Sequence, residues 1–418
     1  MTAVLPDVAT FRAECRDWLA ARLKPRPAAT MTATLPWGVG SDDVSVFHDL
    51  SPGAERDLLD QAMKWQQVKC DAGYGALTWP VEYGGAGLPA AYEEVFNHEE
   101  AAFDTPAQHE TFSVTVRLVA PTINLLGTDR LRERFVRRFV RAEDLCCQLF
   151  SEPGAGSDLA SLGTRAVRDG DEWVINGQKV WSSGARFSAW GELIARTDPN
   201  VPKHAGLTAF IIPMDSPGLE VRPIRQMSGG SSFNEVFFTD VHVPDELRLG
   251  EVGAGWKVAL TTLGFERAGG GTRTVGGSWQ EVAMLARWLD RTGEPLVRQR
   301  VADLYINRRI TQLLREGRAA RAAAGQPPGP EGSIGKLRWS QDLTRTSEVV
   351  SYLLGPRLTA DTGEWGTYSW TAQVLGAPGY RIAGGSDEIQ RNIIGERVLG
   401  LPPEPRSDRR MAWRDVPR

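Results

Sequence analysis

A turn built largely from glycine and serine occupies residues 151–158, with the sequence SEPGAGSD. Gly154 and Gly156 would let backbone amides approach an oxygen-rich ligand closely, and Ser151 and Ser157 offer hydroxyl donors beside them. This glycine turn could therefore bind a ligand, although a stretch of such composition is more often only a surface loop.

An aromatic side chain is expected close to the glycine turn. Asn176 and Gly177 form a dipeptide common in β-hairpins, and it lies between two strand-like stretches, 172–175 and 178–181. A hairpin here would bring Trp181 near the turn, with two serines directly after it. A flat ring with hydroxyl donors at its edge suits a planar cofactor that forms hydrogen bonds.

Composition is typical of a globular protein of two or three domains. The chain has 418 residues, 41% hydrophobic and 24% charged, and this length exceeds that of a single hydrophobic core. A formal net charge of −4 gives no general attraction to nucleic acid or to acidic membranes. Four cysteines and five histidines show neither metal-ligand spacing nor a disulfide framework, so we expect no metal. We see no signal peptide and no membrane-spanning run, and expect a cytoplasmic protein.

Three blocks of hydrophobic patterning follow one another. Apolar residues recur with helical spacing over residues 1–145, alternate with polar residues over 145–244, and return to helical spacing from 255 onward. Helices are predicted at 58–72, 91–103, 131–140, 256–265, 279–290, 297–316, 335–354 and 388–399, and strands at 172–175, 207–212 and 234–243. Two stretches rich in Pro and Gly, 25–52 and 324–332, are predicted loops.

Four motifs, in order, give the chain a resemblance to a known family. They are LTWPVEYGGAGL at 77–88, the glycine turn followed by NGQKVWSS at 176–183, QVLGAPGY at 373–380, and GGSDEIQRNIIGERVLGLP at 384–402. Together they resemble the acyl-CoA dehydrogenase family over most of the chain. The resemblance implies an α+β fold with an N-terminal helical domain (1–145), a small central β-barrel or sandwich domain (146–245) and a C-terminal four-helix bundle (246–418).

The reaction implied by the resemblance is α,β-desaturation of an acyl-CoA thioester in fatty acid or sterol breakdown. A carboxylate removes the α-proton, the β-hydrogen leaves as hydride to FAD, and the electrons pass to an electron-transfer flavoprotein. Two hydrogen bonds to the thioester oxygen and a dry site make the α-proton removable. A homotetramer, or a heterotetramer with a paralogous chain, is expected, without nucleic acid and without membrane insertion.

The resemblance also implies a set of contacts, residue by residue. Around the flavin these are Gln148, Phe150 and Ser151, with Gly156 and Ser157 at the pyrophosphate or the CoA chain, and Trp181 and Ser183 beside the ring. Gln373, Leu375, Gly376 and Ala377 match the segment that reaches the FAD of a neighbouring subunit, and Ser386 and Glu388 match positions on the FAD pyrophosphate and ribose. Ser157 and Arg267 are expected at the substrate.

The catalytic base is not where many family members have it. Their Glu directly precedes Gly-(Thr/Ser) in the last motif, and that position is Gly384 here. Gly384 could still supply a backbone N–H to the thioester oxygen. The stretch 255–271 resembles the helix that carries the base in isovaleryl-CoA and long-chain acyl-CoA dehydrogenases, which places Glu266, next to Arg267, in that role. The alternative is an exposed Glu266 paired with Arg267 or Arg273.

Two departures from the family pattern leave alternatives open. Arg291 matches a motif that contacts the partner's FAD, but the Phe of that motif is missing, and Gly264 stands where an Asp often contacts pantetheine. Besides a dehydrogenase, the chain could be a flavin oxidase or monooxygenase of the same fold, or, because Gly384 stands where the usual base would be, a non-catalytic subunit of a heteromeric dehydrogenase. The acyl group cannot be read from the sequence. Placement of the base favours a branched, cyclic or sterol-derived chain.

Overall fold

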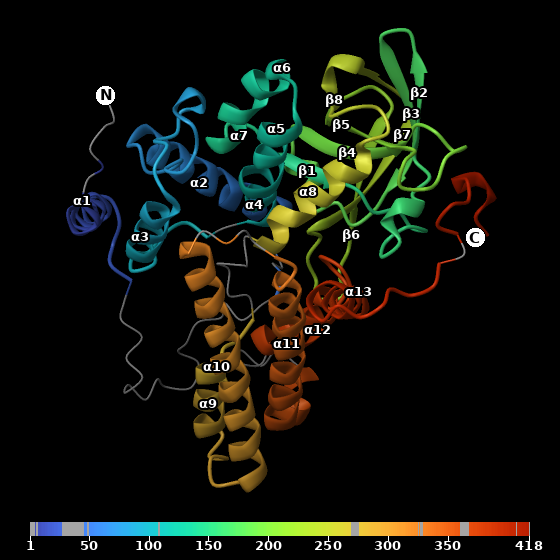
Figure 1. Ribbon diagram of the computed structural model, residues 1–418. Helices are drawn as coiled ribbons and strands as arrows, with labels where there is room; N and C mark the ends of the chain where they lie inside the picture. Colours follow the sequence, from blue (N-terminus) through green and yellow to red (C-terminus); the bar gives the residue numbers. More distant parts are fainter. Residues whose placement is uncertain are drawn as a thin grey trace.

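The computed structural model describes residues 5, 7–26, 46–47, 50–107, 109–268, 276–324, 326, 329–359, 368–406 and 408–417. Figure 1 shows the N-terminal helices beside a central sheet, with a group of longer helices extending from both. One helix, α8 (Gly255–Ala268), runs across the junction and contacts all three parts. The observed order of helices, sheet and helices is the predicted one.

The N-terminal part is helical, as the periodicity predicts. Its helices are α1 (Val8–Ala20), α2 (Pro52–Asp71), α3 (Ala90–Glu100), α4 (Glu110–Ser113), α5 (Ala120–Leu126), α6 (Asp129–Leu131) and α7 (Arg137–Val140). The predicted helices at 58–72 and 91–103 are confirmed as α2 and α3. The one predicted at 131–140 spans α6, a π-helical stretch (Arg132–Val136) and α7.

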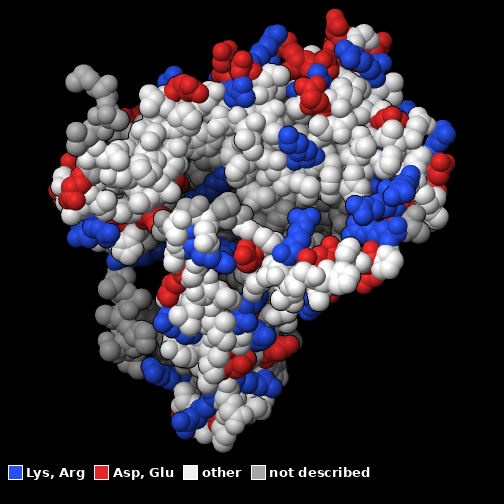
Figure 2. Space-filling model, viewed as in Figure 1, with Lys and Arg blue, Asp and Glu red and all other residues white. Residues whose placement is uncertain are grey.

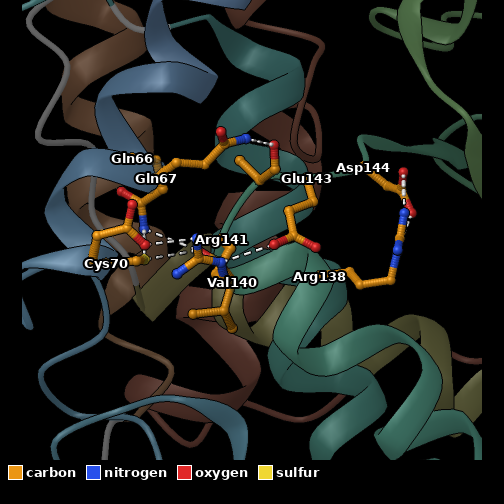
Figure 3. A network of polar contacts seen from close by, with 10 residues as sticks. Gln66, Gln67, Cys70, Arg138, Val140, Arg141, Glu143 and Asp144 are labelled. Carbon is orange, nitrogen blue, oxygen red and sulfur yellow. Dashed lines mark hydrogen bonds and ion pairs between the residues drawn. The ribbon is translucent and has the colours of Figure 1, made fainter.

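Polar contacts tie the end of α2 to the end of α7 (Figure 3). The Gln66 side-chain amide donates to the carbonyl oxygen of Val140 at 2.9 Å, and Arg141 binds Asp71 at 2.8 Å and Glu143 at 2.9 Å. Because the first strand begins shortly after Arg141, this junction fixes where the chain enters the sheet.

The central domain is one eight-stranded sheet. Its strands are β1 (Cys146–Leu149), β2 (Arg165–Asp169), β3 (Glu172–Lys179), β4 (Trp190–Arg196), β5 (Leu207–Pro213), β6 (Leu219–Ile224), β7 (Phe233–Pro244) and β8 (Arg248–Leu249). Strand order is β6-β7-β3-β2-β4-β5-β8, and β1 pairs with β4 in parallel. The strands predicted at 207–212 and 234–243 are confirmed. β1, β2, β4, β6 and β8 were not predicted. β4 is buried on both faces, so it carries no alternation.

The predicted hairpin turn at Asn176-Gly177 is wrong. Glu172–Lys179 is one continuous strand that pairs with β2 and with β7, and its register to β7 shifts between Ile175 and Gly177. The Asn176 amide donates to Asp240 on β7 at 2.9 Å and accepts from its backbone N–H at 3.0 Å. The dipeptide thus forms a bulge within β3, which pairs with one strand on each side. A bulge of this kind does not reverse the direction of the chain.

The C-terminal part is a helical bundle. After α8 come α9 (Trp279–Trp288), α10 (Pro295–Ala323), α11 (Gly332–Leu354), α12 (Tyr368–Tyr380) and α13 (Asp387–Ile393). Every helix predicted after residue 255 is present, and the last one continues α13 as a π-helical stretch (Ile394–Val398). α12 was not predicted because Gly376, Pro378 and Gly379 disfavour a helix. Burial of Trp370, Gln373 and Ala377 outweighs that preference.

Two large hydrophobic cores stabilise the three parts of the chain. One is shared by the N-terminal helices, the sheet and the first half of α8, and includes Phe135, Ile194, Phe210 and Val258. The other lies inside the bundle, with Leu285, Val350 and Trp370. α8 therefore begins in the first core and ends at the bundle. The boundaries predicted at 145 and 245 stay a prediction.

Residues after α13 return to the sheet. Ala412 forms a bridge with Pro202, the Trp413 indole donates to the carbonyl oxygen of Ser161 at 3.1 Å, and the Arg196 guanidinium lies 4.7 Å from the Trp413 ring centre. The predicted loop at 25–52 lies largely outside the described residues. In the one predicted at 324–332, the described residues before α11 belong to no helix or strand, and residues 325, 327 and 328 lie outside the described residues. Within the described ranges, every helix is too short or too polar to cross a bilayer.

Candidate active site

Glu152 organises the glycine turn from within. Its carboxylate accepts hydrogen bonds from the backbone N–H groups of Gly163 at 2.6 Å and Thr164 at 2.8 Å, and from Lys179 Nζ at 2.8 Å. Lys179 is fully buried and also donates to the carbonyl oxygen of Phe150 at 2.9 Å. These bonds fix the turn between the ends of β1 and β3.

Glu152 and Lys179 form a buried charged pair. Burial lowers the pKa of Lys179 to about 8, and the neighbouring Glu152 opposes that change. Burial alone would raise the pKa of Glu152, but the Lys179 ammonium and the N–H donors outweigh it and hold the pKa below its ordinary value. Glu152 is therefore a structural carboxylate, occupied on both oxygens.

The outer side of the glycine turn is open. No described atom comes within 4 Å of a Cβ placed on Gly154 or Gly156, and Ser157 is exposed. The chain's own packing does not require glycine at these two positions. Their small size matters to whatever approaches from outside, which fits a phosphate-bearing cofactor such as FAD.

Polar atoms near the turn and after Trp181 lack partners. The Gln148 side-chain nitrogen and the Ser182 hydroxyl are buried and find no hydrogen-bond partner within the described part of the chain. Trp181 is 59% exposed, and its ring lies in a T-shaped arrangement with Phe233, at 5.8 Å between ring centres. An uncovered indole and unsatisfied buried polar groups fit a planar ligand that forms hydrogen bonds. The residues present therefore suit FAD.

Glu266 and Gly384 meet at the far end of α8. A Cβ built on Gly384 would lie 2.6 Å from Glu266 Oε1, so the carboxylate occupies the space that a side chain at 384 would enter. The Glu266 side chain is exposed, and Gly384 has a φ of +65°, in the left-handed region. Two residues that the sequence singled out separately are thus brought together. The Arg267 side chain lies outside the described residues.

Buried hydroxyl groups hold α8 in place. The Thr262 hydroxyl, one turn before Glu266, donates to Glu192 Oε1 at 2.7 Å and lies 3.0 Å from the Thr122 hydroxyl on α5. Burial raises the pKa of Glu192 to about 8, with the Thr262 hydrogen bond opposing. Glu192 on β4 is therefore a neutral carboxyl at neutral pH and links the sheet to the helix that carries Glu266.

Several further predicted residues lie on the bundle side, whereas Ser151 follows β1 and Ser183 follows β3. Arg291 binds Glu294 at 2.6 Å and the carbonyl oxygens of Tyr352 and Leu353 at 2.8 and 3.1 Å, all within its own chain. Gln373 is buried and accepts a hydrogen bond from the Gly277 N–H. The other assignments on this side stay predictions, namely those of Leu375, Gly376 and Ala377 on α12, Ser386 at the start of α13, and Glu388, which is exposed.

Two polar residues near the site, Lys336 and Glu192, were missed by sequence reasoning. Lys336 on α11 donates to the carbonyl oxygen of Gly385 at 2.7 Å. Asp387 binds Arg381 and the Ser340 hydroxyl, both at 2.9 Å. Glu192 could have been found from the sequence, because a charged residue in an otherwise apolar stretch indicates a buried polar contact. Lys336 gave no such signal, because its importance depends on the backbone turn that its side chain contacts, which the sequence does not show.

Comparison with known proteins identifies the chain's relatives. Three family models match it, those of the acyl-CoA dehydrogenase N-terminal domain over residues 51–143, middle domain over 147–241 and C-terminal domain over 253–399. Acyl-CoA dehydrogenase IpdE1 of Mycobacterium tuberculosis (strain ATCC 25618 / H37Rv) is 38% identical over 407 residues, which cover 96% of this chain and 99% of that relative.

Solved structures agree with the family models. The chain is similar to the Tcur3481-Tcur3483 steroid ACAD, with a TM-score of 0.73 and 26% identity over 97% of this chain and all of that one. It is also similar to the ChsE4-ChsE5 complex from Mycobacterium tuberculosis, with a TM-score of 0.69 and 26% identity over 97% of this chain and 100% of that chain. The predicted fold class is confirmed.

Proposed function

The chain belongs to the acyl-CoA dehydrogenase family of oxidoreductases, and from that membership we propose that it desaturates the α,β bond of an acyl-CoA thioester with FAD as cofactor. When bound, FAD supplies an acceptor for the β-hydrogen, which leaves as hydride. The open glycine turn, the unsatisfied Gln148 amide and the uncovered Trp181 support this cofactor.

Glu266 is the proposed base, and its approach to Gly384 is the observation that carries the proposal. The α-proton passes to a carboxylate oxygen of Glu266, while the Gly384 N–H donates to the thioester oxygen and stabilises the developing negative charge. Substrate binding would cover Glu266 and remove its water, which brings its proton affinity closer to that of the activated α-carbon.

The names of similar proteins support a substrate class and an assembly. One similar structure is named a steroid ACAD, which supports a sterol-derived acyl chain. Another is a complex of two named proteins, which supports a heterotetramer with a paralogous chain as an alternative to a homotetramer. Figure 2 shows a hollow between the bundle and the two other parts, with Lys and Arg side chains along its margins. Basic margins suit the phosphates of CoA. We expect electrons to pass to an electron-transfer flavoprotein in the cytoplasm.

The variant Glu266→Gln tests the base. It keeps size and polarity but cannot accept the proton, so FAD and acyl-CoA should still bind while anaerobic flavin reduction falls by roughly 10²–10⁴-fold. Stopped-flow bleaching of the flavin across a panel of acyl-CoA thioesters measures this and identifies the acyl chain. Near-normal reduction would remove Glu266 from the mechanism. Slow reoxidation of the reduced wild type in air is expected, and rapid reoxidation would indicate an oxidase instead.

The exchange Glu266→Gly with Gly384→Glu is the matched control. It should restore part of the lost rate, because other family members have their carboxylate at the second position. Full recovery is not expected, since a non-glycine residue at φ +65° costs about 1–2 kcal/mol. Gly384→Glu alone should impair reduction, because its Cβ would lie 2.6 Å from the native carboxylate. If the double variant reduces its flavin no faster than Glu266→Gly alone, a carboxylate at position 384 cannot replace Glu266.

A further inference from the structure

The segment of chain that follows Trp181, residues 182–187, is bound at its start by the sheet. The backbone N–H of Ser182 donates to the carbonyl oxygen of Asn234 at 3.0 Å, and the Asn234 side chain donates to the Ser182 carbonyl oxygen at 2.9 Å. The Gly184 N–H donates to the carbonyl oxygen of Ser232 at 3.1 Å. β7 and the residue before it therefore fix the first half of the segment.

Contacts from the N-terminal part of the chain hold the second half. Arg186, in the 3₁₀ turn Ala185–Phe187, donates to Glu55 Oε2 in the first turn of α2. Glu55 Oε1 lies 2.8 Å from His109 Nε2, while His109 Nδ1 accepts the Thr111 N–H at 3.2 Å and so caps α4. Because Nδ1 accepts, the ring proton lies on Nε2 and is donated to Glu55. Both oxygens of the carboxylate are thus bound by donors from other elements.

Glu55 is a buried anion. It is 2% exposed, and His109 is 3% exposed. Burial raises the pKa of Glu55, but the hydrogen bond from His109 and the Arg186 guanidinium outweigh burial and hold that pKa below its ordinary value. The Arg186 side chain is itself only 16% exposed. Removal of the carboxylate would therefore leave a largely buried guanidinium without this counter-ion.

Phe187 adds packing to the charged contact. The Arg186 guanidinium lies 4.7 Å from the centre of the Phe187 ring, and that of Arg56 on α2 lies 4.8 Å from it. The His109 ring is T-shaped to the same ring, at 6.3 Å between centres. α2 and the residue before α4 therefore contact this end of the segment through charge and through aromatic packing.

We propose that Glu55 is a positioning residue for the cofactor, because its bond to Arg186 sets where the segment 182–187 lies and, with it, Ser183 and the preceding Trp181. This inference rests on the proposed binding of FAD beside those two residues. Glu55 itself touches no reacting atom and takes part in no proton transfer. Its effect on the cofactor would pass through Arg186 and the backbone of the segment.

The variant Glu55→Gln tests this role. Both neighbours of Glu55 are donors, so an amide, which has one oxygen and one NH₂ group, can accept from only one of them. FAD should bind the apoprotein about 10-fold more weakly or worse, since hydrogen bonds to charged groups typically contribute that much. Titration of the apoprotein with FAD measures the affinity. Hydrogen–deuterium exchange of the apoprotein, followed on peptides that cover residues 182–187, should be faster than in the wild type.

Glu99→Gln is the matched control. Glu99 on α3 is also a buried carboxylate, 3% exposed, with two cationic partners, Arg12 at 3.1 Å and Arg16 at 2.8 Å. Both partners lie on α1 rather than in the segment after Trp181. This variant should lower the free energy of unfolding, as Glu55→Gln does, but leave FAD affinity and the exchange of residues 182–187 at wild-type values.

Two substitutions of Arg186 test the same contact from its other end, and they decide the matter if Glu55→Gln does not fold. Arg186→Gln should weaken FAD binding as Glu55→Gln does, and Arg186→Lys, which keeps a cation for Glu55, should weaken it less. Wild-type FAD affinity in the Gln variants would overturn the positioning role, even if the protein is less stable or residues 182–187 exchange faster.

An equal loss of FAD affinity in Glu99→Gln would also overturn the role, because the effect would then reflect general stability. A wild type that binds no FAD would overturn the proposed function and this role together, whereas the other outcomes overturn the role of Glu55 alone.

Discussion

Two glutamates near the site, Glu152 and Glu266, show how one residue type serves opposite purposes. Glu152 is nearly buried and accepts from two backbone N–H groups and an ammonium, so both of its oxygens are occupied. Glu266 is exposed at the end of a helix, beside a glycine that leaves room for its carboxylate. A carboxylate whose two oxygens are both saturated with donors is a poor proton acceptor, whereas an exposed one at the end of a helix can be reached by a substrate.

The comparison also separates the proposed cofactor side of the site from its proposed base side. The cofactor side is built by one contiguous stretch of chain, with polar groups fixed by the buried Lys179. The base side is assembled from α8, α11 and the turn before α13, which are distant in sequence. Because only the carboxylate must reach the reacting carbon, the base side can change which helix supplies it, while the cofactor side cannot be redistributed in that way.

The variant Lys179→Met would test how firmly the cofactor side is held. It leaves the Glu152 carboxylate buried without its ammonium, and removing one member of a buried ion pair typically costs about 3–5 kcal/mol of folding free energy. Denaturant unfolding followed by near-UV signals, together with FAD retention, measures the loss. The double variant with Glu152→Gln should lose less. A loss below about 1 kcal/mol for Lys179→Met would mean that the pair is not structural.

Glu192→Gln would test the link between the two sides. The pKa of Glu192 is raised to about 8 in the fold, so the native protein keeps this proton where the unfolded chain has released it. Its contribution to stability is full below the unfolded pKa near 4.5 and falls as pH rises toward 8. The Gln variant does not titrate and so lacks that fall. Its free energy of unfolding should exceed that of the wild type by about 3 kcal/mol at pH 7 and differ little at pH 4.5. Unfolding measured at both pH values checks this, and an equal difference at the two would contradict a neutral Glu192.

Trp181→Ala should have the smallest effect, on cofactor affinity alone. Aromatic contact contributes about 0.5–1.5 kcal/mol beyond its area, so FAD should bind roughly 2–10-fold more weakly. Because the indole is more than half exposed, protein stability should change little. Titration of apoprotein with FAD gives the affinity, and Trp181→Phe is the control that keeps a ring. Unchanged affinity in the Ala variant would remove Trp181 from the flavin contacts.

Periodicity and motifs predicted most helices and the order of the three parts, but tertiary pairing decided the rest. Asn176-Gly177 is a turn signal by local preference, yet a strand with partners on both edges makes it a bulge. α12 forms despite Pro378 because Trp370 and Gln373 are buried in the bundle. In the site, Glu266 and Gly384 were predicted from their motifs. Lys336 could not be, since a lysine on a helix becomes informative only once its neighbours in space are known.

The contact between Trp413 and Ser161 has a consequence for synthesis of the chain. The two residues are 252 positions apart, and Trp413 packs beside Gly163, whose N–H binds Glu152 of the glycine turn. At roughly 5–20 residues per second, a ribosome needs roughly 13–50 s to go from one to the other. During that interval the sheet of the growing chain holds the glycine turn before Trp413 has been added to pack beside it. A translational pause before residue 413 would lengthen that exposure.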